Sequence, residues 1–164
     1  MSGATQKLAE TIIQRCTELK QYVVTAESCT GGLIAGAITD IAGSSAALER
    51  GFVTYSNQSK NEMLGVPADL IEEHGAVSEE VVCAMVVGAL AHSKASFGVA
   101  VTGVAGPGGG SAEKPVGLVY IAAASKEPQR VVVSREIFPD NGRAFIREAT
   151  VERALTMLLD QLDA

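Results

Sequence analysis

The order of strand-like and helix-like patterns along the chain is the feature that most restricts its fold. Five short runs rich in β-branched and apolar residues predict strands at 22–28, 51–56, 97–104, 116–124 and 130–138. Helical patterns separate the first three runs, whereas the last three follow one another without a helix. We therefore expect one α/β domain over residues 1–164, with three α/β/α layers around a mixed, mostly parallel sheet.

The segments between these runs carry the signals of helices. Amphipathic or capped patterns predict helices at 4–20, 31–43, 58–65, 67–74, 78–94 and 143–162, with a short helical piece at 46–49. Asn57 and Ser78 have the residue types of N-caps, and Pro67 fits the start of a helix. No repeat or interdomain linker interrupts the pattern, and the one long loop is 103–115.

Composition limits the classes of partner and site. The net charge of −6 repels phosphate backbones and anionic lipids, so we expect neither a nucleic acid nor a membrane as partner. No apolar run reaches the length of a membrane span and the N-terminus lacks a signal-peptide core, which favours the cytoplasm. Three scattered cysteines and two histidines, without CxxC or HxxxH spacing, indicate reduced thiols and no metal site.

The stretch "TAESCTGG" at 25–32 is the first candidate for chemistry. A strand delivers Ser28 to the edge of the sheet, and a helix is expected two or three residues later. Backbone N–H groups at a helix start are unpaired and can hold an oxyanion or a phosphate. The same pattern also fits a serine or threonine N-cap in a tight turn, so the stretch alone leaves both interpretations open.

Lys60, in "TYSNQSKNEM", is the candidate general base. Partial burial favours the neutral amine that a base requires, although a solvated helix face is the better explanation of a lone lysine. His74, at an expected helix end, and His92, on an expected helix surface, fit structural roles better than catalytic ones. Cys29 is a rival nucleophile, because a thiol at a helix start has a lowered pKa; Glu27, Cys29 and Lys60 would supply a Glu-Lys-Cys amidase.

The loop "TGVAGPGGGSAEKPVG" at 102–117 follows a strand and contains six glycines. Glycine-rich backbone after a strand can wrap a phosphate, but the loop lacks the spacing of the known nucleotide-binding fingerprints. Lys114 could add charge for an anionic ligand, or it could simply be solvated.

Several motifs together resemble the C-terminal domain of the competence/damage-inducible protein A (CinA) family. They are, in order, "TAESCTGG", "GSSA", "ERGFVTYSNQSK", "LGV", "HGAVSEEV", "VTGVAGPGGG" and "KPVGLVY". The likeness runs from about Leu8 to Leu159 and is nearest to the stand-alone nicotinamide-nucleotide amidases. It implies hydrolysis of the carboxamide of nicotinamide mononucleotide in pyridine nucleotide salvage, by a serine–lysine dyad without metal or cofactor. By motif, the dyad is Ser28 and Lys60.

The resemblance and the residue chemistry together suggest a set of site residues. We expect Lys60 to take the Ser28 proton, the N–H groups of Thr30 and Gly31 to stabilise the oxyanion, and Tyr55 to orient the dyad or face the pyridinium ring. The expected substrate-binding residues are Thr30, Gly31, Asn57, Thr102, Gly103, Gly106, Gly108, Gly109 and Arg143. Of these, the glycine loop and Arg143 are assigned to the ribose and phosphate.

Two alternatives stay open on the sequence. The chain could be a non-catalytic nucleotide-binding or regulatory module linked to competence or DNA damage, which would bind the mononucleotide without releasing ammonia. It could also be an amidase whose nucleophile is Cys29. A homodimer is expected for a small enzyme so rich in apolar residues.

Overall fold

The computed structural model describes all residues from Met1 to Ala164. The elements in chain order are α1 (Gly3–Leu19), β1 (Val23–Glu27), α2 (Leu33–Thr39), the 3₁₀ helix η1 (Ser44–Ala46), β2 (Leu48–Val53), α3 (Asn57–Leu64), α4 (Ala68–His74), α5 (Glu79–Ala91), β3 (Phe97–Gly103), β4 (Leu118–Ser125), β5 (Arg130–Ile137) and α6 (Arg143–Asp163). None of the helices is both long enough and apolar enough to span a bilayer.

The strands form one sheet in the order β2-β1-β3-β4-β5. Strand β1 pairs in parallel with both β2 and β3, whereas β4 pairs antiparallel with β3 and β5. Strand β4 is therefore the only one that runs against the others. The predicted α/β class and the mixed, mostly parallel sheet are confirmed.

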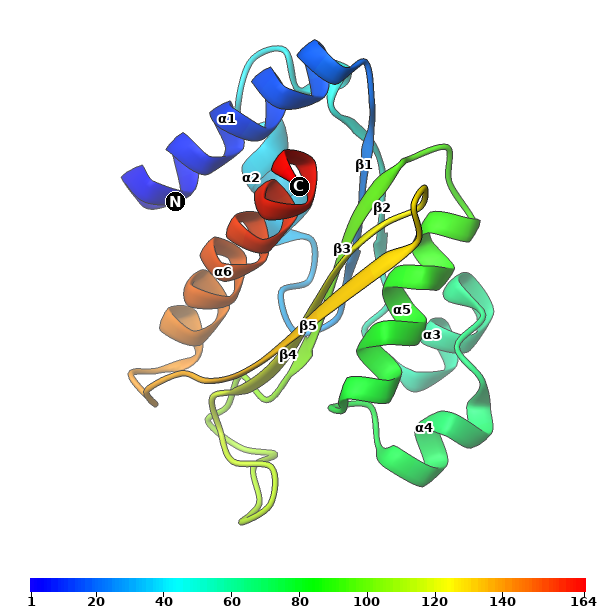
Figure 1. Ribbon diagram of the computed structural model, residues 1–164. Helices are drawn as coiled ribbons and strands as arrows, with labels where there is room; N and C mark the ends of the chain where they lie inside the picture. Colours follow the sequence, from blue (N-terminus) through cyan, green and yellow to red (C-terminus); the bar gives the residue numbers. More distant parts are fainter.

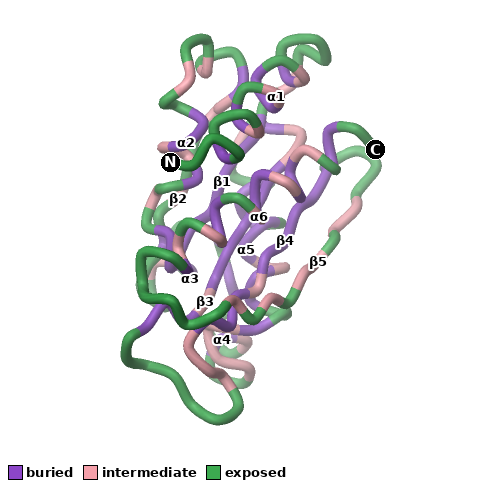
Figure 2. Tube along the Cα trace, turned by 90° about the vertical axis from the view of Figure 1, so that its left-hand side faces the viewer, coloured by how far each residue is buried: buried purple, intermediate pink, exposed green.

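Helices cover both faces of this sheet (Figure 1). Helices α1, α2 and α6 lie on one face, and α3, α4 and α5 lie on the other. Successive strand residues point to opposite faces, so Val23 and Val99 enter the core under α1 and α6, while Val24 and Ala100 enter the core under α5. The central strands are buried and the edge strands β2 and β5 are partly exposed (Figure 2).

Several boundaries differ from the predicted ones. Strand β2 begins at Leu48, because the chain enters the sheet directly after η1; the predicted short helical piece forms, but as η1 over Ser44–Ala46 rather than at 46–49. Helix α2 starts only at Leu33, since Gly32 has a left-handed φ of 107° that a helix cannot include. Ser56, rather than Asn57, caps α3 by accepting from the N–H of Ser59.

Candidate active site

Ser28 lies directly after β1, at the carboxyl ends of the parallel strands. Its N–H donates to Val101 O at 3.2 Å, which continues the pairing of β1 with β3 by one residue. Crevices outside the carboxyl ends of parallel strands are the usual ligand-binding positions in open α/β sheets. Strand β3 and the chain leaving β2 end beside Ser28, so their last residues face the same crevice.

Lys60 reaches Ser28 from α3. Its Nζ donates to Ser28 Oγ at 2.8 Å, to Thr54 O at 2.9 Å and to Tyr55 O at 3.2 Å. The side chain is 1% exposed. Burial disfavours the ammonium form and lowers the pKa of Lys60 to about 8. The two residues, 32 positions apart in sequence, thus form a hydrogen-bonded pair with a lysine that deprotonates readily.

The pair opens into a cavity of about 190 Å³. Seven of the residues expected at the site line it: Ser28, Tyr55, Asn57, Lys60, Thr102, Gly103 and Arg143. Four further residues complete the wall: Cys29, Ala76, Val77 and Ala105. The lining therefore combines a nucleophile and a base with an apolar wall and a cationic rim.

Arg143, the first residue of α6, crosses the rim of this cavity. One guanidinium nitrogen donates to Gly106 O at 2.8 Å, and the other donates to the Tyr55 hydroxyl at 3.0 Å. Tyr55 is 59% exposed, so its ring lies at the entrance. These contacts join α6, the glycine loop and the segment before α3 around one opening.

The remaining expected residues lie outside the cavity lining. The Thr30 hydroxyl is buried and donates to Glu27 Oε1 at 2.6 Å, so it is not available to a substrate. The N–H of Gly31 donates to Ser28 O at 3.1 Å, which corrects the expectation that it binds an oxyanion. Gly108 and Gly109 lie exposed in the long loop, and Gly106 meets the site only through its carbonyl.

Glu27 has a role that the residue pattern alone did not reveal. Its buried carboxylate accepts from Thr30 Oγ1, from Ile34 N at 2.8 Å and from Ala35 N at 3.1 Å. It therefore caps α2 from seven residues upstream and closes the turn around Ser28. Because Glu27 ends β1, several residues before the first residue of α2, the sequence contains no local capping signal for it.

Cys29 lies beside the pair but is a poor nucleophile. Burial raises the pKa of its thiol to about 11, and Lys60 Nζ is hydrogen-bonded to Ser28 Oγ instead. Of the other candidates, Lys114 donates to His74 O at 2.7 Å and the Nδ1 of His92 contacts Gly88 O; none of the three lines the cavity.

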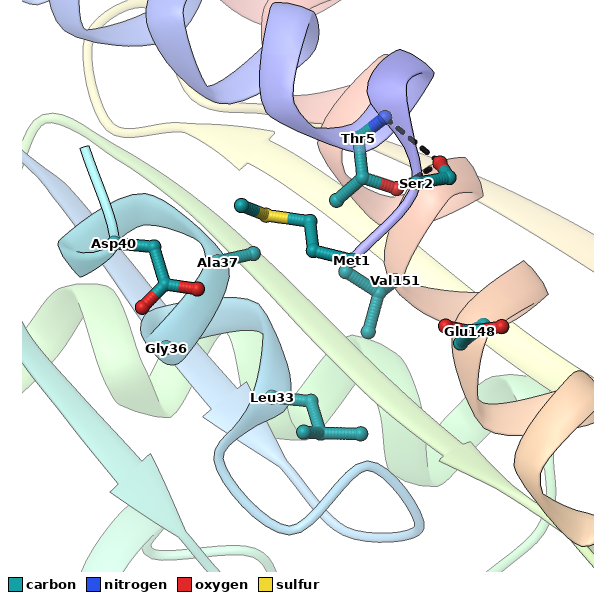
Figure 3. A pocket seen from close by; sticks show the side chains of 9 residues that line it. All are labelled: Met1, Ser2, Thr5, Leu33, Gly36, Ala37, Asp40, Glu148 and Val151. Carbon is teal, nitrogen blue, oxygen red and sulfur yellow. Dashed lines mark hydrogen bonds between the residues drawn. The ribbon is translucent and has the colours of Figure 1, made fainter.

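A larger cavity, of about 330 Å³, is lined by residues from the start of α1, from the α2 segment and from α6 (Figure 3). Met1, Leu33 and Val151 supply much of its apolar lining, and Asp40 and Glu148 lie at opposite sides of it. None of the expected site residues lines it, and it holds no nucleophile paired with a base. The smaller cavity is therefore the candidate active site.

Comparisons with known proteins agree with one another. The family model described as the CinA C-terminal domain matches residues 5–162. The nicotinamide-nucleotide amidohydrolase PncC of Escherichia coli strain K12 is 48% identical over 151 residues, which cover 92% of this chain and 91% of the relative. PncC of Enterobacter agglomerans is 53% identical over 137 residues, covering 84% and 83%. The crystal structure of the competence/damage inducible protein CihA from Agrobacterium tumefaciens has a TM-score of 0.97 at 52% identity, covering 100% of this chain and 98% of that one.

Proposed function

This chain belongs to the CinA C-terminal domain family, and we propose that it hydrolyses the carboxamide of nicotinamide mononucleotide to nicotinate mononucleotide and ammonia. The amidohydrolase names of its relatives support the reaction class. The observation that carries the mechanism is the 2.8 Å contact between Lys60 Nζ and Ser28 Oγ, two buried residues that line the cavity.

The hydrogen bonds of Lys60 suit a general base. A neutral amine has two N–H donors and one lone pair. The carbonyls of Thr54 and Tyr55 occupy two donors, which leaves the lone pair directed at the Ser28 hydroxyl. Lys60 then accepts the proton as Ser28 Oγ attacks the amide carbon.

The remaining steps follow from the same two groups. Lys60 returns the proton to the departing nitrogen, so ammonia leaves and an acyl-enzyme ester remains on Ser28. Lys60 next takes a proton from water, whose oxygen attacks the ester, and gives it back to Ser28 as the acid is released. The backbone N–H groups of Cys29 and Thr30, in the turn after Ser28, stabilise the oxyanion in both halves of the reaction.

The size of the cavity indicates how the substrate is bound. At about 190 Å³ it is smaller than the roughly 300–1,000 Å³ of pockets that enclose a whole drug-sized ligand. We therefore propose that the pyridine ring enters beside Ala76 and Val77 while ribose and phosphate stay at the rim, near Arg143 and the glycine loop. This reaction would serve pyridine nucleotide salvage in the cytoplasm.

The test is ammonia release from nicotinamide mononucleotide by the purified protein, measured beside Ser28→Ala, Lys60→Ala and Cys29→Ala. We expect the first two variants to lose at least about 10³-fold in kcat while staying folded, and Cys29→Ala to keep most activity. Binding of the mononucleotide without ammonia release would favour the non-catalytic module. Loss of activity in Cys29→Ala alone would favour the thiol as nucleophile.

A further inference from the structure

We infer that Arg147 is a positioning residue that fixes the oxyanion-binding backbone of the Ser28 turn; this inference rests on the proposed function. Arg147 belongs to α6 but does not line the cavity. Its Nε donates to Cys29 O and its Nη2 donates to Thr30 O, each at 3.1 Å. One rigid guanidinium thus holds two consecutive carbonyls just after the nucleophile.

Through Gly31, these two bonds also fix the peptide between Ser28 and Cys29. In a trans peptide the N–H points opposite to the carbonyl. Arg147 holds Thr30 O, so the N–H of Gly31 in the same peptide is directed away from the guanidinium. That N–H donates to Ser28 O at 3.1 Å, which in turn fixes the peptide between Ser28 and Cys29. All three carbonyls from Ser28 to Thr30 are therefore occupied.

The N–H groups of Cys29 and Thr30 donate to no backbone carbonyl of the protein. Each points away from a carbonyl that is held, and Cys29 lines the cavity beside Ser28. The N–H of the residue after a nucleophile is the oxyanion donor in other serine hydrolases with a strand-to-helix turn. Cys29 N–H is thus the principal donor, with Thr30 N–H as the second, and Arg147 sets the direction of both.

The opposite side of the turn is held independently of Arg147. Glu27 binds the Thr30 hydroxyl and the first N–H groups of α2. Loss of Arg147 should therefore leave α2 and the Lys60–Ser28 contact in place while the peptides at 28–31 gain freedom. The consequence is weaker stabilisation of the transition state rather than weaker substrate binding.

The experiment compares Arg147→Ala, Arg147→Lys and the control Arg153→Ala, another α6 arginine that donates to Glu136 Oε1 at 2.8 Å away from the site. We expect kcat for ammonia release to fall about 100-fold in Arg147→Ala with KM changed less than about threefold. A low, non-denaturing concentration of guanidinium chloride should restore part of the lost kcat of Arg147→Ala, and the same concentration of sodium chloride should not.

Arg147→Lys keeps the charge but not the forked pair of N–H donors, so its kcat should fall about tenfold. Arg153→Ala should keep wild-type kcat.

A second probe separates this inference from the proposed function. Phenylmethanesulfonyl fluoride forms a bond from Ser28 Oγ to sulfur, expels fluoride and passes the serine proton to Lys60. We expect its labelling of Ser28, followed by mass, to slow at least about tenfold in Arg147→Ala. If the wild type labels in an Arg147-dependent way but does not hydrolyse the mononucleotide, only the proposed function fails.

Three results would overturn the role of Arg147. They are an unchanged kcat in folded Arg147→Ala, a rise in KM with kcat intact, and a loss that guanidinium does not restore. If Arg147→Ala does not fold, an unaltered kcat in Arg147→Lys overturns the inference instead. A wild type that neither hydrolyses nor labels overturns both proposals.

Discussion

Lys60 is the residue on which the proposed chemistry depends most. The ammonium form has three donors and the structure offers it three acceptors, so the charged state is fully hydrogen-bonded. Burial disfavours the ammonium form more than these hydrogen bonds favour it, so the pKa of Lys60 is lowered to about 8. About one lysine in ten is then neutral at pH 7, so a working base is present without an activating histidine.

The pH dependence of the rate follows from this titration. Because only neutral Lys60 accepts the Ser28 proton, kcat/KM for ammonia release should rise with pH and reach half its plateau near pH 8. Initial rates between pH 6 and 10 would measure it, with Lys60→Ala showing no such rise in its residual rate. A wild-type rate that is flat or falling between pH 7 and 9 would exclude Lys60 as the base.

At the scale of elements, the Glu27 carboxylate connects β1 to α2. It accepts three hydrogen bonds in a buried position, at a helix start where no side chain at the N-cap, Gly32, can help. Glu27→Gln removes the charge and turns an N–H₂ group toward N–H donors. We expect it to lower the free energy of unfolding by roughly 2–4 kcal/mol in urea titrations.

The control for Glu27 is the exposed Glu10 of α1, which contacts only Gln6. Glu10→Gln should stay within about 0.5 kcal/mol of the wild type. Equal stability of the two variants would show that the capping contacts contribute nothing measurable.

Replacing a helical glycine by alanine should change the stability in opposite directions at two positions, Gly36 and Gly88. A Cβ at Gly36 of α2 meets no atom within 4 Å, whereas a Cβ at Gly88 of α5 lies 2.0 Å from Leu64 O at the end of α3. Gly36→Ala should stabilise by about 0.5–1 kcal/mol, since alanine favours helix. Gly88→Ala should destabilise by at least about 1–3 kcal/mol and lower activity, because it displaces the helix that carries Lys60. Urea unfolding of both variants tests this; a stabilised Gly88→Ala would contradict the close packing of α5 on α3.

Elements were predictable to the extent that local pattern determines them. The central strands β1, β3 and β4 are buried, and their apolar runs were recognisable. The edge strand β2 carries Glu49 and Arg50 on its partly exposed surface, so its start could not be read from hydrophobicity. The start of α2 depends on a distant carboxylate and on Gly32, which no local propensity describes.

At the scale of the whole molecule, the site is assembled from five separate segments. They are Ser28 after β1, Lys60 in α3, Ala76 and Val77 between α4 and α5, Thr102 and Gly103 at the end of β3, and Arg143 at the start of α6. The family motifs identified the dyad, and residue type and spacing suggested Thr102 and Arg143. Nothing in the sequence placed Lys60 within 2.8 Å of Ser28 or Arg147 against two carbonyls. Side-chain bonds to distant backbone arise from tertiary packing, which is why the candidate dyad could be predicted and its support could not.

Holding a lysine in this interior costs the whole fold some stability, and that cost should depend on pH. Lys60 loses its proton at lower pH in the folded chain than in the unfolded chain, whose pKa is near 10.5. Between about pH 8 and 10.5 the unfolded chain therefore binds more protons, and stability relative to a lysine-free variant rises with pH. The lowering of the Lys60 pKa to about 8 corresponds to roughly 3 kcal/mol.

The free energy of unfolding of the wild type, minus that of Lys60→Met, should increase by up to this amount from pH 8 to 10.5 and change little from pH 6 to 7. Urea titrations of both proteins at matched pH measure the difference. The other titrating groups are common to both proteins, so the comparison isolates Lys60. A difference that stays constant across the range would mean that Lys60 keeps an ordinary pKa in the folded chain. It would then be too rarely neutral near pH 7 to act as the base.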